Sequence, residues 1–282
     1  MMARTDVNTL LLKIGFLVLV VVLYFFARSL FLLQADRYQS RVAGNEIYRS
    51  IAKSRTKVSG ISKLVLGDSA ANQLYNNSRY NDSIYSLTCN QAISMAGYYL
   101  LLKNFLETNP ELHDLEIYLI YHPKSFKNNL DQIYTFHYFL KPFNTAEYRP
   151  LFSATVLKQI EKMPFNRYAQ LFFIKTNNWA PPYGLTDNKH DIHLSDISRE
   201  YLMKIIDLSG SYGHTFKLLP PLVSRNFREP IEKFRSQISG SDILAEHLGP
   251  YLEQIVYWDD SLFSDGIHLK HPGKLGENPL KL

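Results

Sequence analysis

The sequence predicts an α/β domain with a mostly parallel sheet, preceded by an N-terminal transmembrane helix. Two patterns indicate this fold class: a long apolar run near the N-terminus, and short strand-like runs that alternate with helical patterns from residue 61 onwards. The 282 residues suffice for one large domain, and the apolar content of 46% excludes a disordered chain. The single cysteine, Cys89, excludes an intramolecular disulfide framework.

The apolar run lies within residues 10–33 and is interrupted by two basic residues. Its central part, residues 14–27, is short for a membrane span, which takes about 20 residues. Lys13 and Arg28 can extend their charged ends to the interface, so the whole stretch is long enough to cross. A cleaved signal peptide and a buried core helix are the alternatives. We expect a membrane anchor over residues 1–33 and a membrane-proximal helix or stalk over residues 34–60.

Basic charge is concentrated beside this anchor. The formal net charge is +5, but the first sixty positions hold nine basic and three acidic residues, against 22 and 23 in the remainder. A nucleic-acid-binding protein would carry its basic face on the folded domain, so nucleic acid is excluded as a partner. The basic stretch instead suits anionic lipid headgroups. Charges flank the apolar run on both sides, so they do not determine its orientation.

The remainder of the chain alternates between strand and helix patterns. Strands are predicted at residues 63–66, 84–88, 115–121, 215–219 and 254–258, and helices at 95–108, 195–208 and 230–238. Such an alternation is typical of a parallel sheet covered by helices, so residues 61–282 are expected to form one domain.

Residues 124–194 do not fit the alternation and are rich in aromatic residues. A connection of this length inside a compact domain is usually a functional insertion. Three interpretations remain open: a lid or wall that stacks on a sugar or acyl group, a helical insertion with its own small core, and a surface that packs on the membrane interface.

A serine follows the first predicted strand directly, in the motif Gly67-Asp68-Ser69. The carboxyl ends of parallel strands are where open α/β sheets bind ligands, and a following helix offers free N–H groups for a developing oxyanion. The alternative is that Ser69 only caps this helix.

A second motif lies near the C-terminus, in Asp265-Gly266-Ile267-His268. An aspartate three residues before a histidine can hold one ring nitrogen, so that the other accepts a proton from a serine. A surface turn is the alternative for this motif alone. His190 and His193 also lie three apart but lack a clear third ligand, so no metal and no cofactor is expected.

The two motifs together, serine first and Asp–His last, resemble the SGNH hydrolases, also called GDSL-type esterases, over roughly residues 60–273. The resemblance implies a three-layer α/β/α flavodoxin-like sandwich. It also implies that Ser69 is the nucleophile, His268 the general base and Asp265 the acid that orients the base.

Two further sequence blocks of that family are altered here. Met95 stands at the usual glycine spacing after Asn90, and Tyr121-His122-Pro123-Lys124 replaces the G-x-N-D block. The oxyanion is therefore expected to be held by the backbone of Gly67, Asp68 and Ser69 and by the Asn90 region. The oxyanion-hole side chain of the G-x-N-D block either has no counterpart here or is replaced by another residue. Asn72 and His122 are the two candidates for that replacement.

The function implied is a membrane-anchored serine esterase or O-acyltransferase. It would act outside the cytoplasm, in the periplasm or extracellular space, on acyl esters of envelope carbohydrate, acetyl esters in particular. The alternative is a catalytically impaired scaffold that binds glycan or a partner acyltransferase, which the missing G-x-N-D block favours. A structural single-span protein would leave the serine and histidine motifs unexplained.

Overall fold

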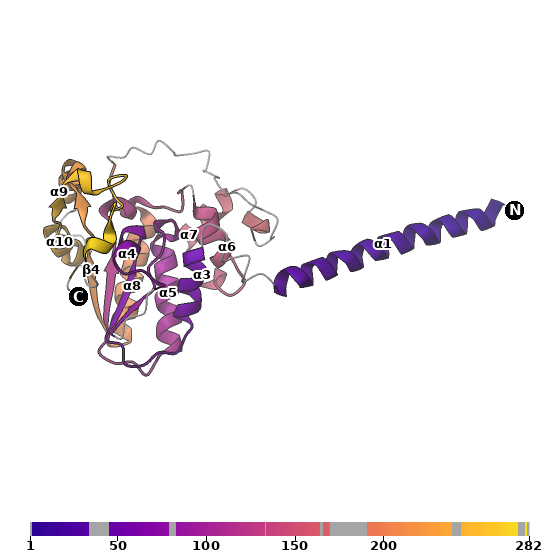
Figure 1. The fold of residues 1–282 in the computed structure, drawn as a ribbon, viewed down its shortest axis with the longest axis horizontal. Coiled ribbons are helices and arrows are strands. Elements are labelled where there is room, and N and C mark those ends of the chain that lie inside the picture. The colour runs from indigo at the N-terminus through magenta and orange to yellow at the C-terminus, as the bar shows by residue number, and fades with distance from the viewer. Residues whose placement is uncertain are drawn as a thin grey trace. The chain divides into compact units, whose positions relative to one another are not determined.

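A computed structural model describes residues 2–33, 45–78, 83–132, 134–163, 166–169, 191–238 and 244–275, together with Leu280 and Leu282 (Figure 1). The chain divides into two compact units, Met1–Asn45 and Glu46–Leu282.

The first unit contains one long helix, α1, over Met2–Leu33. Its segment Val7–Arg28 has 22 residues and a mean hydropathy of 2.7, and none of it is buried. At 1.5 Å per residue this segment is about 33 Å long, which matches the hydrocarbon thickness of a bilayer. The helix is therefore long and apolar enough to cross a membrane, a property it shares with signal sequences. Its full exposure distinguishes it from a core helix.

The second unit is built on a four-stranded sheet, as the alternation predicted. The strands are β1 (Lys63–Gly67), β2 (Ile84–Ser86), β3 (Glu116–Ile120) and β4 (Thr215–Leu219). Their order is β2-β1-β3-β4 and every pairing is parallel. The loops that follow β1, β2 and β3 therefore meet at one edge of the sheet.

Helices cover both faces of this sheet (Figure 1). Alternate β1 residues point to opposite faces: Leu64 and Leu66 join the main core, whereas Val65 joins a smaller cluster. The main core contains residues of α5 (Ser94–Thr108) and α8 (Asp196–Ser211), and the smaller one those of α4 (Ser69–Leu74). The predicted α/β class with a mostly parallel sheet is therefore confirmed.

The prediction of a strand over residues 254–258 is wrong for most of that range. Helix α10 (Ala245–Glu253) ends at Gln254, and only Tyr257–Trp258 forms a strand, β6. This strand pairs in parallel with β5 (Val223–Ser224) in a separate two-stranded sheet. Helix α9 (Arg228–Gln237) lies between them in the chain, close to the predicted 230–238.

The expected stalk over residues 34–60 is also too long. Residues 45–54 form helix α3 (Asn45–Ser54), and the compact unit begins at Glu46. Ile47 lies in the main core, and the buried Ser50 hydroxyl donates to the Thr88 carbonyl at 3.1 Å. Ser54 is buried as well, so one face of α3 packs on the domain and the helix is part of the fold.

The described part of the aromatic-rich insertion is helical. It contains a π-helix at Phe136–Leu140, followed by α6 (Lys141–Phe143), and then α7 (Ala154–Lys162), with 3₁₀ turns at Arg149–Leu151 and Asn166–Tyr168. Its buried aromatic rings join the main core: Phe136, Tyr138, Phe139, Phe143, Tyr148 and Phe152. These rings support neither a separate small core nor a wall facing substrate. Trp179 and Tyr183 lie outside the described residues.

Candidate functional site

Ser69 is the first residue of α4, immediately beyond the carboxyl end of β1. The residue that caps this helix is Asp68, whose Oδ1 accepts the N–H groups of Ala70 at 3.0 Å and Ala71 at 3.3 Å. The interpretation of Ser69 as the N-cap is therefore wrong. Because the neighbouring carboxylate already caps the helix, the Ser69 hydroxyl is left for another partner.

The sharp turn that presents Ser69 depends on Gly67. Its φ of +156° is rare for other residues, and an added Cβ would lie 2.2 Å from the Ile120 carbonyl oxygen and 2.5 Å from the Ala71 Cβ. Gly67 thus allows α4 to start directly against β3, and its role here is structural.

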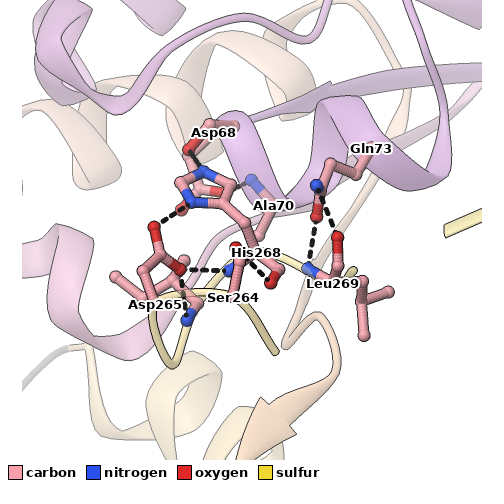
Figure 2. A network of polar contacts seen from close by, with 9 residues as sticks. Asp68, Ala70, Gln73, Ser264, Asp265, His268 and Leu269 are labelled. Atoms are coloured by element: carbon pink, nitrogen blue, oxygen red, sulfur yellow. Dashed lines mark hydrogen bonds and ion pairs between the residues drawn. The ribbon is translucent and has the colours of Figure 1, made fainter. Parts of the chain in front are cut away.

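His268 meets Ser69 across 199 residues of sequence, and Figure 2 shows the surrounding contacts. Its Nε2 lies 2.8 Å from the Ser69 Oγ, and its Nδ1 lies 2.6 Å from the Asp265 Oδ2. A carboxylate accepts hydrogen bonds, so the ring proton sits on Nδ1 and Nε2 accepts the serine hydroxyl. The structure brings together the three residues predicted as nucleophile, base and orienting acid.

Asp265 is held in place by its own turn. Its Oδ1 accepts the N–H of Ile267 at 3.0 Å and of His268 at 2.8 Å, while Oδ2 faces the ring. Partial burial acts to raise the pKa of Asp265, but these hydrogen bonds outweigh it and leave the pKa below its ordinary value. The carboxylate therefore stays ionised and fixes the tautomer of His268.

Asp68 has the opposite environment. It is only 1% exposed, and its Oδ2 accepts the His122 N–H and the Ser125 hydroxyl, both at 2.7 Å. Burial raises the pKa of Asp68, although its hydrogen bonds, led by the one from Ser125, act to lower it. With the two N–H groups of α4, these contacts join the ends of β1 and β3 through one side chain, so Asp68 organises the site without reaching the reacting atoms.

Asn72, one candidate for the missing oxyanion donor, is held by its amide oxygen. Its Oδ1 accepts the Asn77 N–H at 3.1 Å and the Thr88 hydroxyl at 2.9 Å. The amide oxygen therefore ties α4 to the segment after β2. The N–H groups on Nδ2 take no part in these two bonds, so the role of Asn72 as the replacement donor stays a prediction.

Asn90 and Met95 belong to the segment that follows β2. The Asn90 Oδ1 accepts the Ala92 N–H at 2.9 Å and caps the 3₁₀ turn Gln91–Ile93, and the side chain is half-buried. The Met95 side chain is fully buried in the main core, so only its backbone could serve the site.

His122, the other candidate, is fully buried at the end of β3. Its Nδ1 accepts the Lys124 N–H at 3.2 Å, so the proton of the neutral ring sits on Nε2. Burial, with smaller contributions from Lys124 and His268, lowers the pKa of His122 to about 3. Among the described residues the Nε2 atom has no hydrogen-bond partner. His122 is therefore a neutral N–H donor with unused capacity, adjacent to the Ser69 turn.

Sequence reasoning missed three residues of this neighbourhood. Gln73 exchanges two hydrogen bonds with the backbone of Leu269, Ser125 binds Asp68, and Phe227 packs edge-to-face on His122 with ring centroids 4.9 Å apart. Only Gln73 carried a signal, because a residue four positions after Ser69 lies on the same face of a helix.

His193, one of the two histidines weighed as metal ligands, pairs with an aspartate of its own segment. The His193 Nδ1 lies 3.1 Å from the Asp191 Oδ2, and both side chains are about half exposed. His190 lies outside the described residues. Within the part of the chain that the structure describes, no group of three or more histidine, cysteine or acidic residues is arranged to hold a metal ion.

No family model, no curated protein and no solved structure matches the chain.

Proposed function

We propose that the chain is a serine hydrolase or acyltransferase of the SGNH type that cleaves acyl esters. The observation that carries the proposal is the pair of contacts at His268, 2.8 Å to the Ser69 Oγ and 2.6 Å to the Asp265 Oδ2. These distances lie within the reach required of a nucleophile, a base and the group that orients the base.

The first half-reaction follows from these contacts. His268 Nε2 removes the hydroxyl proton as the Ser69 Oγ attacks the ester carbonyl carbon, and the carbonyl electrons move onto oxygen. The C–O bond to the alcohol then breaks, and His268 returns the proton to the leaving alcohol. The product is an acyl group on Ser69.

The second half-reaction releases the acyl group. Water or a sugar hydroxyl attacks the acyl carbonyl and gives its proton to His268, and Ser69 regains a proton as it leaves. Water yields a free acid, and a sugar hydroxyl yields a new ester.

Two donors are proposed for the oxyanion. The Ser69 N–H precedes the two N–H groups that Asp68 caps, and the His122 Nε2–H supplies the donor that an asparagine provides in the family. A neutral imidazole can act in this way because it donates a hydrogen bond without adding a mobile proton to the reaction.

The fold and location are proposed by the same resemblance. The order β2-β1-β3-β4 is that of the first four strands of a flavodoxin-like sheet, which supports the SGNH sandwich. Helix α1 supports anchoring in membrane lipid. We propose an extracytoplasmic domain and a carbohydrate ester, acetyl in particular, as substrate.

A second function, a scaffold that binds glycan or a partner acyltransferase without turnover, is favoured by one observation. The G-x-N-D block is absent, and His122, which stands in that segment, is fully buried. Turnover distinguishes the two functions.

The experiment uses the full-length chain in detergent micelles with p-nitrophenyl acetate. Ser69→Ala and His268→Ala are each expected to reduce kcat by about 10⁴-fold or more. Ser153→Ala removes the N-cap serine of α7 and His193→Ala breaks the other His–Asp pair, and both should retain wild-type kcat. Wild-type turnover in either of the first two variants, or no turnover by the folded wild type, would contradict the proposal.

A further inference from the structure

The base loop, residues 264–269, carries Asp265 and His268 and has little regular structure. The Ser264 N–H donates to the His268 carbonyl at 2.8 Å, and Phe263 forms an isolated antiparallel bridge with Leu269. The Asp265 carboxylate accepts N–H groups of its own turn. These bonds set the shape of the loop, but none of them fixes its distance from Ser69.

Apolar contacts attach the loop to the sheet side of the site. Leu269 and Leu275 pack on the smaller core cluster that contains Leu74 and Tyr75. Apolar burial is non-directional, so it holds the loop nearby without selecting the position of the imidazole. A directional contact is needed to keep Nε2 within hydrogen-bond distance of the serine.

Gln73 supplies such a contact. Its Oε1 accepts the Leu269 N–H at 2.8 Å, and its Nε2 donates to the Leu269 carbonyl at 3.2 Å (Figure 2). Both partners belong to the residue that directly follows His268. Gln73 itself lies one turn after Ser69 in α4, so one short helix carries both the nucleophile and the tether.

The chemistry of the side chain suits this use. The backbone of Leu269 presents one donor and one acceptor, and a primary amide presents one of each in the complementary order. A carboxylate could accept but not donate, and an aliphatic side chain could do neither. The Gln73 amide therefore pairs with the Leu269 backbone as one residue pairs with another in a β-sheet, by one accepted and one donated hydrogen bond.

We propose that Gln73 is a positioning residue, which holds the backbone beside His268 so that the imidazole stays within hydrogen-bond distance of Ser69. This inference rests on the proposed function. It predicts that losing the two bonds lowers the rate of the chemical step while substrate binding and the overall fold persist, because the apolar contacts of the loop remain.

The test compares Gln73→Met and Gln73→Glu with the wild-type full-length chain in detergent. Gln73→Met keeps the volume and removes both bonds, so kcat for p-nitrophenyl acetate should fall by about 10- to 100-fold with little change in KM. The rate of Ser69 labelling by a fluorophosphonate should fall by the same factor. Gln254→Ala, which removes an amide-to-backbone bond from the end of α10, should leave both rates unchanged.

Gln73→Glu provides a readout that a merely structural role would not give. In its ionised form the introduced carboxylate would repel the Leu269 carbonyl, whereas in its protonated form it would donate to that carbonyl and still accept the N–H. The ratio of variant to wild-type kcat should therefore rise as the pH is lowered from 8 towards 5.

The outcomes separate the two proposals. If the wild type neither turns over ester nor labels at Ser69, the proposed function fails and the inference fails with it. If the wild type is active and Gln73→Met retains its kcat and labelling rate, the inference alone is overturned. A ratio for Gln73→Glu that does not change with pH would also count against it.

Discussion

The two halves of the candidate site differ in how they are held. The nucleophile turn, residues 67–69, lies between buried strands, and its central residue Asp68 is 1% exposed. The base loop, residues 264–269, is at the surface, with the side chains of Asp265 and His268 53% and 34% exposed. The position of the serine is set by the core of the domain, whereas that of the histidine depends on a few hydrogen bonds.

The difference in burial shifts the pKa values of Asp68 and Asp265 in opposite directions. Burial raises the pKa of Asp68, whereas the hydrogen bonds of Asp265 outweigh its partial burial and lower its pKa. The half-exposed aspartate can therefore keep the charge that orients a base, and the buried one serves to join β1, β3 and α4. Motif position alone would not assign these roles, because both aspartates lie next to residues of the site.

The largest effect is expected from removing the negative charge of the base loop. Asp265→Asn should reduce kcat for ester hydrolysis by about 10⁴-fold, since the amide can present a donor to Nδ1 and favour the wrong tautomer. Steady-state kinetics of the full-length chain measures the change. Asp191→Asn alters the matched pair beside His193 and should have no effect. A loss of less than tenfold for Asp265→Asn would show that this carboxylate does not orient the base.

Each half of the site contains a glycine with positive φ, +156° at Gly67 in the nucleophile turn and +86° at Gly266 in the base loop. The cost of an alanine at each position compares how tightly the two halves are packed. Gly67→Ala should lower the free energy of unfolding by about 4 kcal/mol, since its Cβ would overlap backbone and helix atoms. Gly266→Ala should cost about 1 kcal/mol, because its Cβ would meet only the Phe227 ring, at 3.3 Å. Urea unfolding followed by circular dichroism measures both. Equal losses would remove the distinction between the two halves.

The buried side of the site also contains the proposed oxyanion donor. His122→Phe should reduce kcat by about 10²- to 10³-fold, as does the loss of one oxyanion-hole donor elsewhere. The ring is retained for packing on Phe227, so the variant should fold, as judged by circular dichroism. Unchanged kcat in the folded variant would exclude His122 from this role.

Asp68→Asn tests the hydrogen bonds by which the Asp68 carboxylate links the ends of β1 and β3. The carboxylate accepts four donors, two at each oxygen, and an asparagine amide would turn its own N–H groups towards one of these pairs. The free energy of unfolding should fall by about 2 kcal/mol, because two buried donors lose their acceptor. Urea unfolding of the full-length chain provides the value. A variant as stable as wild type would mean that these bonds do not hold the turn.

The smallest expected effect concerns the pH dependence of Asp265. A carboxyl whose pKa is lower in the folded than in the unfolded chain stabilises the fold above its ordinary value, here 3.8, and the stabilisation is lost as the pH falls through the folded-state pKa. Asp265 is half exposed, so the contribution should be below about 1 kcal/mol. The stability difference between wild type and Asp265→Asn should therefore shrink below pH 4. A difference that grows on acidification would contradict the lowered pKa.

The sequence predicted the central contacts because each motif is local. Ser69 follows a strand closely, and Asp265 and His268 are three residues apart, so each motif can be recognised by itself. Their meeting was expected from the family resemblance and not from strand order, because β6, the strand before the base loop, lies in a separate sheet. The burial of His122 and its unused Nε2 atom needed coordinates, since they depend on Phe227 and Lys124 as neighbours.

Other errors have similar physical causes. Helix α3 is short and polar, and its burial comes from contacts with distant residues such as Thr88, so its sequence resembles a stalk. Strand β6 has only two residues, too few for a period-2 pattern to mark its limits. The insertion's aromatic rings carry no sequence signal that separates a core from a binding wall.

The most direct test of the central claim is covalent labelling of the full-length chain with a fluorophosphonate, with the modified residue located by mass spectrometry. A nucleophilic serine paired with His268 should give a single adduct on Ser69, absent in Ser69→Ala and slowed by about 10³-fold or more in His268→Ala. Folded protein that gives no adduct, or an adduct on another serine, would contradict the assignment of Ser69 as a catalytic nucleophile.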